Sequence, residues 1–203
     1  FLSKIVRPNW RSPKTWLMTA KGLARRPQVL GLIARLVPGH LKSPWLPPKL
    51  LMAIPKGLYL GQWCVENGID QIHAHFLTSP TTVAMIAAEV SGVPYSYTAH
   101  AFDITSTAPR TVNGSIPLKI KRAAVGVTIS NFNYRHLHER WPSIAGANLH
   151  VVYNGINTEQ FKADGAGQRA HHEGEPWRVL AVSRLEPVKG YDHLIRAIHL
   201  LRQ

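Results

Sequence analysis

The sequence predicts an α/β fold built around a doubly wound parallel sheet. Apolar runs of strand length alternate with apolar patterns of helical period from residue 69 to residue 155, and Gly, Pro and Asn residues separate them. Because each expected strand is followed by a helix, the strands are expected to run parallel in one sheet. The 203 residues suffice for one large domain, or for one domain with part of a second.

Residues 1–65 are expected to form a basic, helical part of the N-terminal domain. They contain 11 Lys and Arg residues and no Asp or Glu, whereas residues 66–203 contain 13 basic and 11 acidic residues. Eight prolines up to Pro55 exclude one long helix and predict short helices joined by turns. One helix is expected from Pro27 to Pro38-Gly39, and a further one over residues 55–66.

Residues 66–154 are expected to hold the sheet. Strands are predicted over residues 69–76, 95–99, 125–129 and 149–153. A polar loop reaching about Asn113 follows the second strand. The expected helices run from Ser79-Pro80 to Gly92, over residues 115–123, and from the N-cap Ser130 to about Trp141.

Residues 155–176 are expected to form a linker between domains. Their Gly, Asp, Gln and His residues offer little apolar surface to bury. The cluster His171-His172-Glu173 suggests a metal site, but adjacent histidines in a polar linker are more often solvated.

Residues 177–203 are expected to begin a second domain. Residues 178–183 predict a buried strand, and apolar residues at helical spacing from Tyr191 onward predict an amphipathic helix. Arg184 follows the strand and Lys189 precedes the helix start, whose free N–H groups suit a diphosphate. The spacing alone fits an ordinary βα corner with two solvated cations equally well. Because one strand and one helix cannot enclose a core, we expect an internal fragment of a longer protein.

Polar side chains follow the predicted strands at the edge where doubly wound sheets bind ligands. His100 and Asp103 follow the strand at 95–99, and the alternative for His100 is a capping or core histidine. His73 and His75 share one face of their strand. A zinc pair is conceivable there, but no third ligand follows at metal spacing.

Two further positions at this edge have two interpretations each. Ser130 is expected as a helix cap, although the N–H groups behind it can also contact a ligand. Asn154 and Gly155 are either turn residues or residues that border a cleft. The sequence contains no Gly-x-Ser-x-Gly nucleophile elbow and no Walker loop.

Five motifs follow one another along roughly residues 47–203. They are Asp70-Gln-Ile-His-Ala-His-Phe76, Tyr97-Thr-Ala-His-Ala-Phe-Asp-Ile104, Val127-Thr-Ile-Ser130, Val151-Val-Tyr-Asn-Gly-Ile-Asn157 and Val182-Ser-Arg-Leu-Glu-Pro-Val-Lys-Gly190. In this order they resemble the family 4 glycosyltransferases, most of all members that make exopolysaccharide and lipid-linked oligosaccharides. The resemblance implies a GT-B fold, in which two Rossmann-like domains face each other across a cleft. Residues 66–154 then belong to the acceptor-side domain, and residues 177–203 to the first βα unit of the nucleotide-sugar-binding domain.

The resemblance also implies a reaction and roles for its residues. A sugar would pass, with retention, from a nucleotide diphosphate sugar to a glycan or lipid-linked acceptor. Arg184 and Lys189 would hold the donor diphosphate, with no metal or other cofactor expected. His100 would contact the donor sugar and stabilise charge as the bond breaks, and His75 could approach donor or acceptor. A pair of donor-binding glutamates would follow Gln203, so this fragment by itself is expected to be inactive.

The basic N-terminal segment leaves other functions open. Cations interleaved with Trp residues suit nucleic acid or an anionic membrane, and a solvated surface is the simplest alternative. The resemblance favours peripheral attachment at the cytoplasmic inner face of a membrane, without nucleic acid. The competing functions are a nonenzymatic binding module and a phosphorylase or epimerase of the same fold.

The cysteine content and the hydropathy of the sequence bear on the cellular compartment of the protein. Cys64 is the only cysteine, so no intrachain disulfide forms and a reducing compartment is compatible. No unbroken apolar run reaches about 18 residues, the length of a transmembrane helix.

Overall fold

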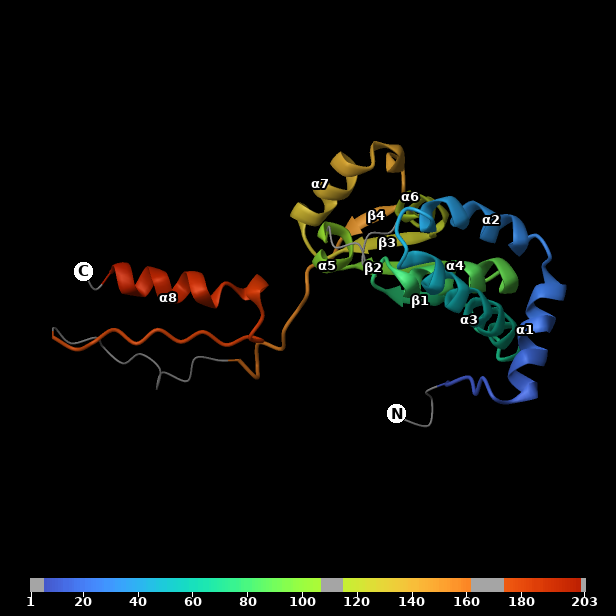
Figure 1. The fold of residues 1–203 in the computed structure, drawn as a ribbon, viewed down its shortest axis with the longest axis horizontal. Coiled ribbons are helices and arrows are strands. Elements are labelled where there is room, and N and C mark those ends of the chain that lie inside the picture. Colours follow the sequence, from blue (N-terminus) through green and yellow to red (C-terminus); the bar gives the residue numbers. More distant parts are fainter. Residues whose placement is uncertain (1–5, 107–114, 162–173, 202–203) are drawn as a thin grey trace. The chain divides into compact units, whose positions relative to one another are not determined.

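The computed structural model describes residues 6–106, 115–161 and 174–201, which divide into a unit ending at Gly155 and a unit beginning at Ile156. In the first unit, four parallel strands form one sheet in the order β1-β2-β3-β4 (Figure 1). The strands are β1 (Ile72–His75), β2 (Tyr95–Ala99), β3 (Val125–Thr128) and β4 (Leu149–Val151). The predicted α/β class with a parallel, Rossmann-like sheet is therefore confirmed.

Helices connect the strands, as the alternation in the sequence predicted. Most match the expected positions, whereas a short helix, α5, occupies the start of the expected polar loop. The helices are α4 (Ser79–Ser91), α5 (Ala101–Thr105), α6 (Ile116–Arg122) and α7 (Asn131–Arg140), followed by the 3₁₀ turn η2 (Pro142–Ile144). Because α4 packs on β1 and β2, Ile72 and Ala74 of β1 are buried, while the alternate residues His73 and His75 are exposed.

The basic N-terminal segment contains three helices, α1 (Pro13–Arg25), α2 (Val29–His40) and α3 (Leu46–Glu66). The expected end of α2 at Pro38-Gly39 and the expected start of α3 at residue 55 are both wrong. Pro47 and Pro48 lie in the first turn of α3, where backbone N–H groups have no partner within the helix. Pro55 and Pro38 lie inside their helices, where tertiary packing offsets the lost hydrogen bond.

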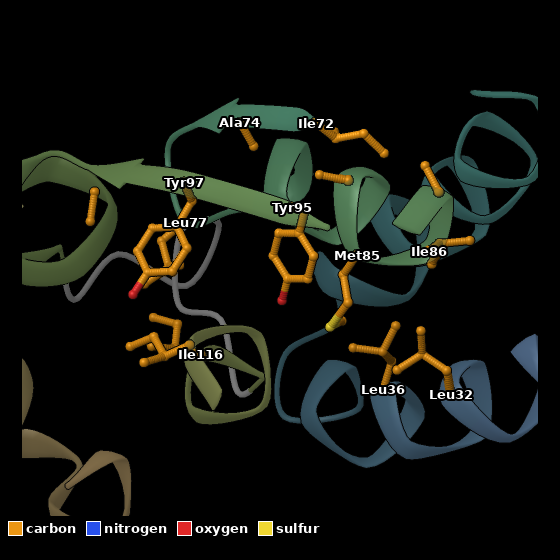
Figure 2. Packing of buried hydrophobic residues seen from close by; sticks show 14 of the residues in the cluster. Leu32, Leu36, Ile72, Ala74, Leu77, Met85, Ile86, Tyr95, Tyr97 and Ile116 are labelled. Carbon is orange, nitrogen blue, oxygen red and sulfur yellow. The ribbon is translucent and has the colours of Figure 1, made fainter. Parts of the chain in front are cut away.

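The core of the first unit lies between the sheet, α4, α2 and α6. Leu32 and Leu36 of α2 face Met85 and Ile86 of α4, while the tyrosine rings of β2 point into the same layer (Figure 2). All of these side chains are at least 97 % buried, with Tyr97 fully so. Such burial explains why α2, although it carries Arg35 and is flanked by Arg26 and Lys42, stays attached to the sheet domain.

Two glycines allow α3 to approach α4 closely. A Cβ atom at Gly57 would lie 2.6 Å from Ile86 Cβ, and one at Gly61 would lie 2.5 Å from Val90 Cβ. Real Cβ atoms do not pack this tightly, so the short distance between α3 and α4 requires glycine at both positions.

The described part of the second unit contains the 3₁₀ turn η3 (Pro187–Lys189) and the helix α8 (Tyr191–Leu200). The predicted helix is present, but the strand predicted over residues 178–183 is wrong: no strand forms there, and Leu180 and Val182 are 87 % and 85 % exposed. A strand needs backbone partners and a covering layer, which the described residues of this unit do not supply. The cluster at residues 171–173 and the loop at residues 107–114 lie outside the described residues.

Candidate active site

The carboxyl ends of the four parallel strands lie at one edge of the sheet, and predicted site residues gather there. His75 is the last residue of β1, and His100 directly follows β2. Ser130 follows β3, while Asn154 and Gly155 follow β4 and are exposed. This is the edge at which ligands bind in α/β sheets of this kind.

His75 and His100 form a direct pair at this edge. Their Nδ1 and Nε2 atoms are 3.3 Å apart, and the rings are stacked with centroids separated by 5.6 Å. One of these nitrogens carries the hydrogen and the other accepts it, so the two rings orient each other. The ring of Phe76 packs on His100 with a centroid distance of 4.7 Å. The pair can thus present an imidazole in a defined orientation to a ligand.

His73 lies beside this pair but is bound to the sheet. Its Nδ1 is 2.7 Å from Ser96 Oγ, and its Nε2 is 3.1 Å from Thr98 Oγ1. Burial, and then the charge of His75, lower the pKa of His73, which favours the neutral ring. Within the described ranges, no group of three or more His, Cys, Asp and Glu residues could hold a metal ion.

The backbone that follows His75 is strained. Phe76 has φ of 71° and is the one non-glycine residue with a positive φ in the described part of the chain. A bulky residue rarely adopts this conformation, so surrounding contacts must maintain it. Thr81 Oγ1 donates to the Phe76 carbonyl oxygen at 2.7 Å. The strained turn carries the chain from His75 into α4 and sets the Phe76 ring against His100.

Asp103 supports this turn from inside the protein and does not face an open cleft. The residue is 97 % buried, and the Leu77 N–H donates to its Oδ2 at 2.6 Å. Burial raises the pKa of Asp103, while the hydrogen bond from Leu77 and the nearby His100 oppose that shift. Asp103 follows β2 as the sequence predicted, but it is not the cleft contact that was expected there, because its carboxylate is buried against the β1–α4 turn.

Lys119 of α6 is a further residue of this arrangement, one that the sequence analysis missed. Its side chain is fully buried, and Nζ donates to the carbonyl oxygens of Leu77 at 3.0 Å and Thr78 at 2.7 Å. Burial lowers its pKa to about 7, and the charge of Asp103 partly offsets this effect. A signal was present, because Lys119 lies at helical spacing on the apolar face formed by Ile116 and Ile120.

Ser130 is a helix cap, one of the two interpretations of its position. Its Oγ accepts a hydrogen bond from the Asn133 N–H at 3.1 Å. The next residue, Asn131, donates through Nδ2 to Tyr153 Oη at 2.8 Å, which links α7 to the segment after β4. The side chain of Ser130 is thus occupied in the protein itself.

Arg184 and Lys189 belong to the second unit. Arg184 is largely exposed, and its Nη1 lies 3.1 Å from Glu186 Oε1. Lys189 ends η3, and Gly190, with φ of 68°, is the N-cap of α8. Both cations therefore lie close in sequence to the amino end of α8, as predicted, although no buried strand precedes them.

Comparison with known proteins shows the family. Residues 16–160 match the model of Glycosyltransferase Family 4, and the chain belongs to this family of transferases. The chain is also similar to a phosphatidyl-myo-inositol mannosyltransferase of Propionibacterium freudenreichii subsp. shermanii, with 23% identity over 154 residues. This similarity covers 76% of the chain but 39% of the relative, so the chain spans well under half of the length of that protein.

Proposed function

We propose that the full-length protein is a retaining glycosyltransferase that moves a sugar from a nucleotide diphosphate sugar to a glycan or lipid-linked acceptor in cell-surface polysaccharide synthesis. The observation that carries this proposal is the His75–His100 pair at the carboxyl edge of the sheet, in a chain of Glycosyltransferase Family 4. An imidazole held in this way can donate a hydrogen bond to the sugar or to the leaving phosphate as charge develops. The mannosyltransferase relative, named for a phosphatidyl-myo-inositol, favours a lipid-borne acceptor.

The donor diphosphate is proposed to bind at Arg184 and Lys189. Two cations beside a helix amino end can offset the charge of a departing diphosphate, which a metal ion does in other transferases. Arg184 would exchange its contact with Glu186 for the phosphate. Because that ion pair is exposed, breaking it costs little.

The acceptor is proposed to reach the enzyme at the anionic inner face of a membrane. Residues 1–65 contain 11 cations and no acid, and Trp16 and Trp45 expose about half of their surface. Exposed indole rings and cations suit the membrane interface. Across the described residues, every helix is too short or too polar to span a bilayer.

Product analysis with the full-length protein tests the proposed reaction. Purified protein is incubated with nucleotide sugars and with lipid-linked or free glycan acceptors, and NMR then determines the configuration of each new glycosidic bond. We expect transfer with the anomeric configuration of the donor. An inverted product would contradict the retaining mechanism. Release of a sugar phosphate from a glycan would instead identify a phosphorylase, and a changed nucleotide sugar an epimerase.

A further inference from the structure

An exposed aromatic residue follows each of the four strands at the carboxyl edge of the sheet. It comes one residue after β1, three after β2, four after β3 and two after β4. The exposed fractions of these side chains are 42 % for Phe76, 63 % for Phe102, 61 % for Phe132 and 64 % for Tyr153. A single exposed aromatic side chain is common on a protein surface. Several at the ligand-binding edge of one sheet mark a place where another molecule binds, and we call these four residues the aromatic row.

Contacts within the first unit join the aromatic row to the histidine pair. The ring of Phe76 packs on His100, and His100 is the N-cap of the helix α5 that carries Phe102. The helix α5 in turn packs against α7, which carries Phe132 (Figure 1). The row is therefore continuous with the candidate active site.

The far end of the row is held in place by contacts of its own. Asn131 donates through Nδ2 to Tyr153 Oη at 2.8 Å, and the ring of Phe132 is stacked on His136 at a centroid distance of 6.0 Å. Because the Tyr153 hydroxyl accepts the amide hydrogen, it can donate its own hydrogen to a ligand. The aromatic rings are thus presented in defined positions, with polar groups beside them.

The segments that form this edge carry no exposed Lys, Arg, Asp or Glu. These segments are residues 72–82, 95–106, 125–134 and 149–155, and Asp103, the one residue of these four types in them, is 97 % buried. The edge is thus uncharged in a chain whose net charge is +13. Phosphate and carboxylate groups are recognised by Arg and Lys side chains. The aromatic row therefore matches a ligand without formal charge.

A neutral glycan matches this combination of side chains. A pyranose ring has a face of C–H groups, which packs on an aromatic ring, and a rim of hydroxyls, which need hydrogen-bond partners. The edge supplies aromatic rings together with imidazole, amide and phenol groups. Neighbouring parallel strands lie about 4.8 Å apart, so a row across four strands spans about 14 Å, more than one sugar ring occupies.

We propose that the aromatic row binds two or more successive uncharged sugar residues of the acceptor. The sugar that is to be extended lies at the His75–His100 pair, and the preceding sugars pack on Phe102 and Phe132. The inference rests on the glycosyl transfer proposed above and specifies the acceptor as a neutral oligosaccharide chain.

Two matched substitutions at Phe132 separate ring stacking from apolar bulk. Phe132→Tyr keeps an aromatic ring, whereas Phe132→Leu keeps an apolar side chain and loses the flat ring. Neither changes the net charge. Because Phe132 is exposed, circular dichroism should show a folded protein in both cases.

Binding is measured on the full-length protein without any sugar donor. Mannose, glucose, galactose and their neutral tri- and tetrasaccharides are titrated in turn, with trigalacturonate as the charged comparison. We expect at least one neutral oligosaccharide to bind more tightly than its monosaccharide and than trigalacturonate. Phe132→Leu should weaken this binding about fivefold, and Phe132→Tyr should change it less than about twofold. Affinity for the monosaccharide should be equal in all three proteins, because only a longer chain reaches Phe132.

Three results would overturn the proposed subsite. The first is that no oligosaccharide binds more tightly than its monosaccharide, and the second is that trigalacturonate binds more tightly than every neutral chain. The third is equal oligosaccharide affinity in the wild type and Phe132→Leu. If Phe132→Leu also lowered thermal stability in that case, another segment of the full-length protein would be what covers the ring.

Transfer assays on the same variants distinguish this inference from the proposed function. Transfer to a glycan with the same acceptor KM in Phe132→Leu as in the wild type would remove the subsite and leave the function. Oligosaccharide binding that depends on the Phe132 ring, without transfer to any acceptor, would keep a glycan-binding row and remove the transferase.

Discussion

At the scale of single residues, Lys119 holds the backbone next to the histidine pair. Its ammonium group binds two successive carbonyl oxygens, those of Leu77 and Thr78, and the Asp103 carboxylate binds the Leu77 N–H. Both sides of the turn after Phe76 are thereby attached to the core. The backbone of Phe76 is strained by its positive φ. It keeps this conformation because buried, charge-assisted hydrogen bonds hold the neighbouring residues.

The first prediction concerns the pH dependence of stability. The pKa of Lys119 falls from 10.5 to about 7 on folding, so between these values the unfolded chain binds more protons than the native protein. The free energy of unfolding therefore rises with pH in this window. We expect the wild type to gain stability relative to Lys119→Met from pH 7 to pH 10.5, as measured by urea unfolding.

The exposed Lys121 of the same helix provides the control for this prediction. The stability of Lys121→Met should follow that of the wild type across the range, since this side chain is exposed. At pH 7 itself, Lys119→Met leaves two carbonyl oxygens unpaired, which costs about 1–3 kcal/mol for each buried group left unsatisfied. A wild-type minus Lys119→Met difference that stays constant with pH would contradict the proposed titration.

The second prediction concerns His100 in the full-length enzyme. His100→Ala should lower kcat about 10²-fold and leave nucleotide affinity nearly unchanged, because the proposed contact strengthens as the bond breaks. Steady-state kinetics and calorimetry with the nucleoside diphosphate measure the two quantities. His73→Ala is the matched control. His73 lies on the same face of β1 as His75, but both of its ring nitrogens contact Ser96 and Thr98 of the sheet. Equal losses of kcat and affinity in His100→Ala, or loss of folding, would count against the assigned role.

At the scale of elements, the contact between α3 and α4 joins the basic segment to the sheet. At Gly57 and Gly61 of α3, side chains of α4 lie too close to leave room for a Cβ atom. The basic N-terminal segment is thus held by packing as well as by chain connectivity. Its position relative to the strand edge in the first unit depends on this interface.

The third prediction tests this interface with two alanine substitutions that should change the free energy of unfolding in opposite directions. Gly61→Ala forces a Cβ atom into Val90 and should destabilise the protein by about 1–3 kcal/mol through overpacking. Gly31→Ala on α2 adds a Cβ atom with nothing within 4 Å, and should stabilise by about 0.5–1 kcal/mol through helix propensity. Urea unfolding measures both. If Gly61→Ala stabilised the protein as Gly31→Ala does, α3 and α4 would not be tightly packed in solution.

At the scale of the whole molecule, the two units differ in how much of their surface is buried. The first has an extensive core, whereas none of the described residues of the second is buried. Arg184 and Lys189 therefore lie on an exposed surface of the described chain. The proposed donor site is best tested in the full-length protein, because the chain spans 39% of the mannosyltransferase that it resembles.

The fourth prediction concerns that donor site. Arg184→Ala and Lys189→Ala should each weaken binding of a nucleoside diphosphate by about 1.5–3 kcal/mol, the range for hydrogen bonds to charged groups. Titration calorimetry on the full-length protein measures this loss. Arg196→Ala removes the same charge from an exposed position beyond the first turn of α8 and should leave affinity unchanged. Unchanged affinity in both Arg184→Ala and Lys189→Ala would remove these residues from the donor site.

The sequence by itself determined the parallel sheet, the order of its four strands along the chain, and the placement of His75 at the end of one strand and of His100 directly after the next. These features depend on local periodicity and on caps such as Ser130, which neighbouring residues specify. The resemblance to the family likewise rests on the order of short motifs, and the match over residues 16–160 confirms it.

Only the tertiary structure decided which polar groups are buried and which strained conformations persist. In the sequence, Lys119 and Asp103 are simply two polar residues. Contacts with residues more than 20 positions away direct their side chains toward the Leu77–Thr78 backbone. The left-handed backbone of Phe76 had no local signal, because glycine is the usual residue there. The strand predicted at residues 178–183 is wrong because strand formation also depends on contacts with distant residues. A strand is completed by hydrogen bonds and packing from other segments, and no local pattern can supply them.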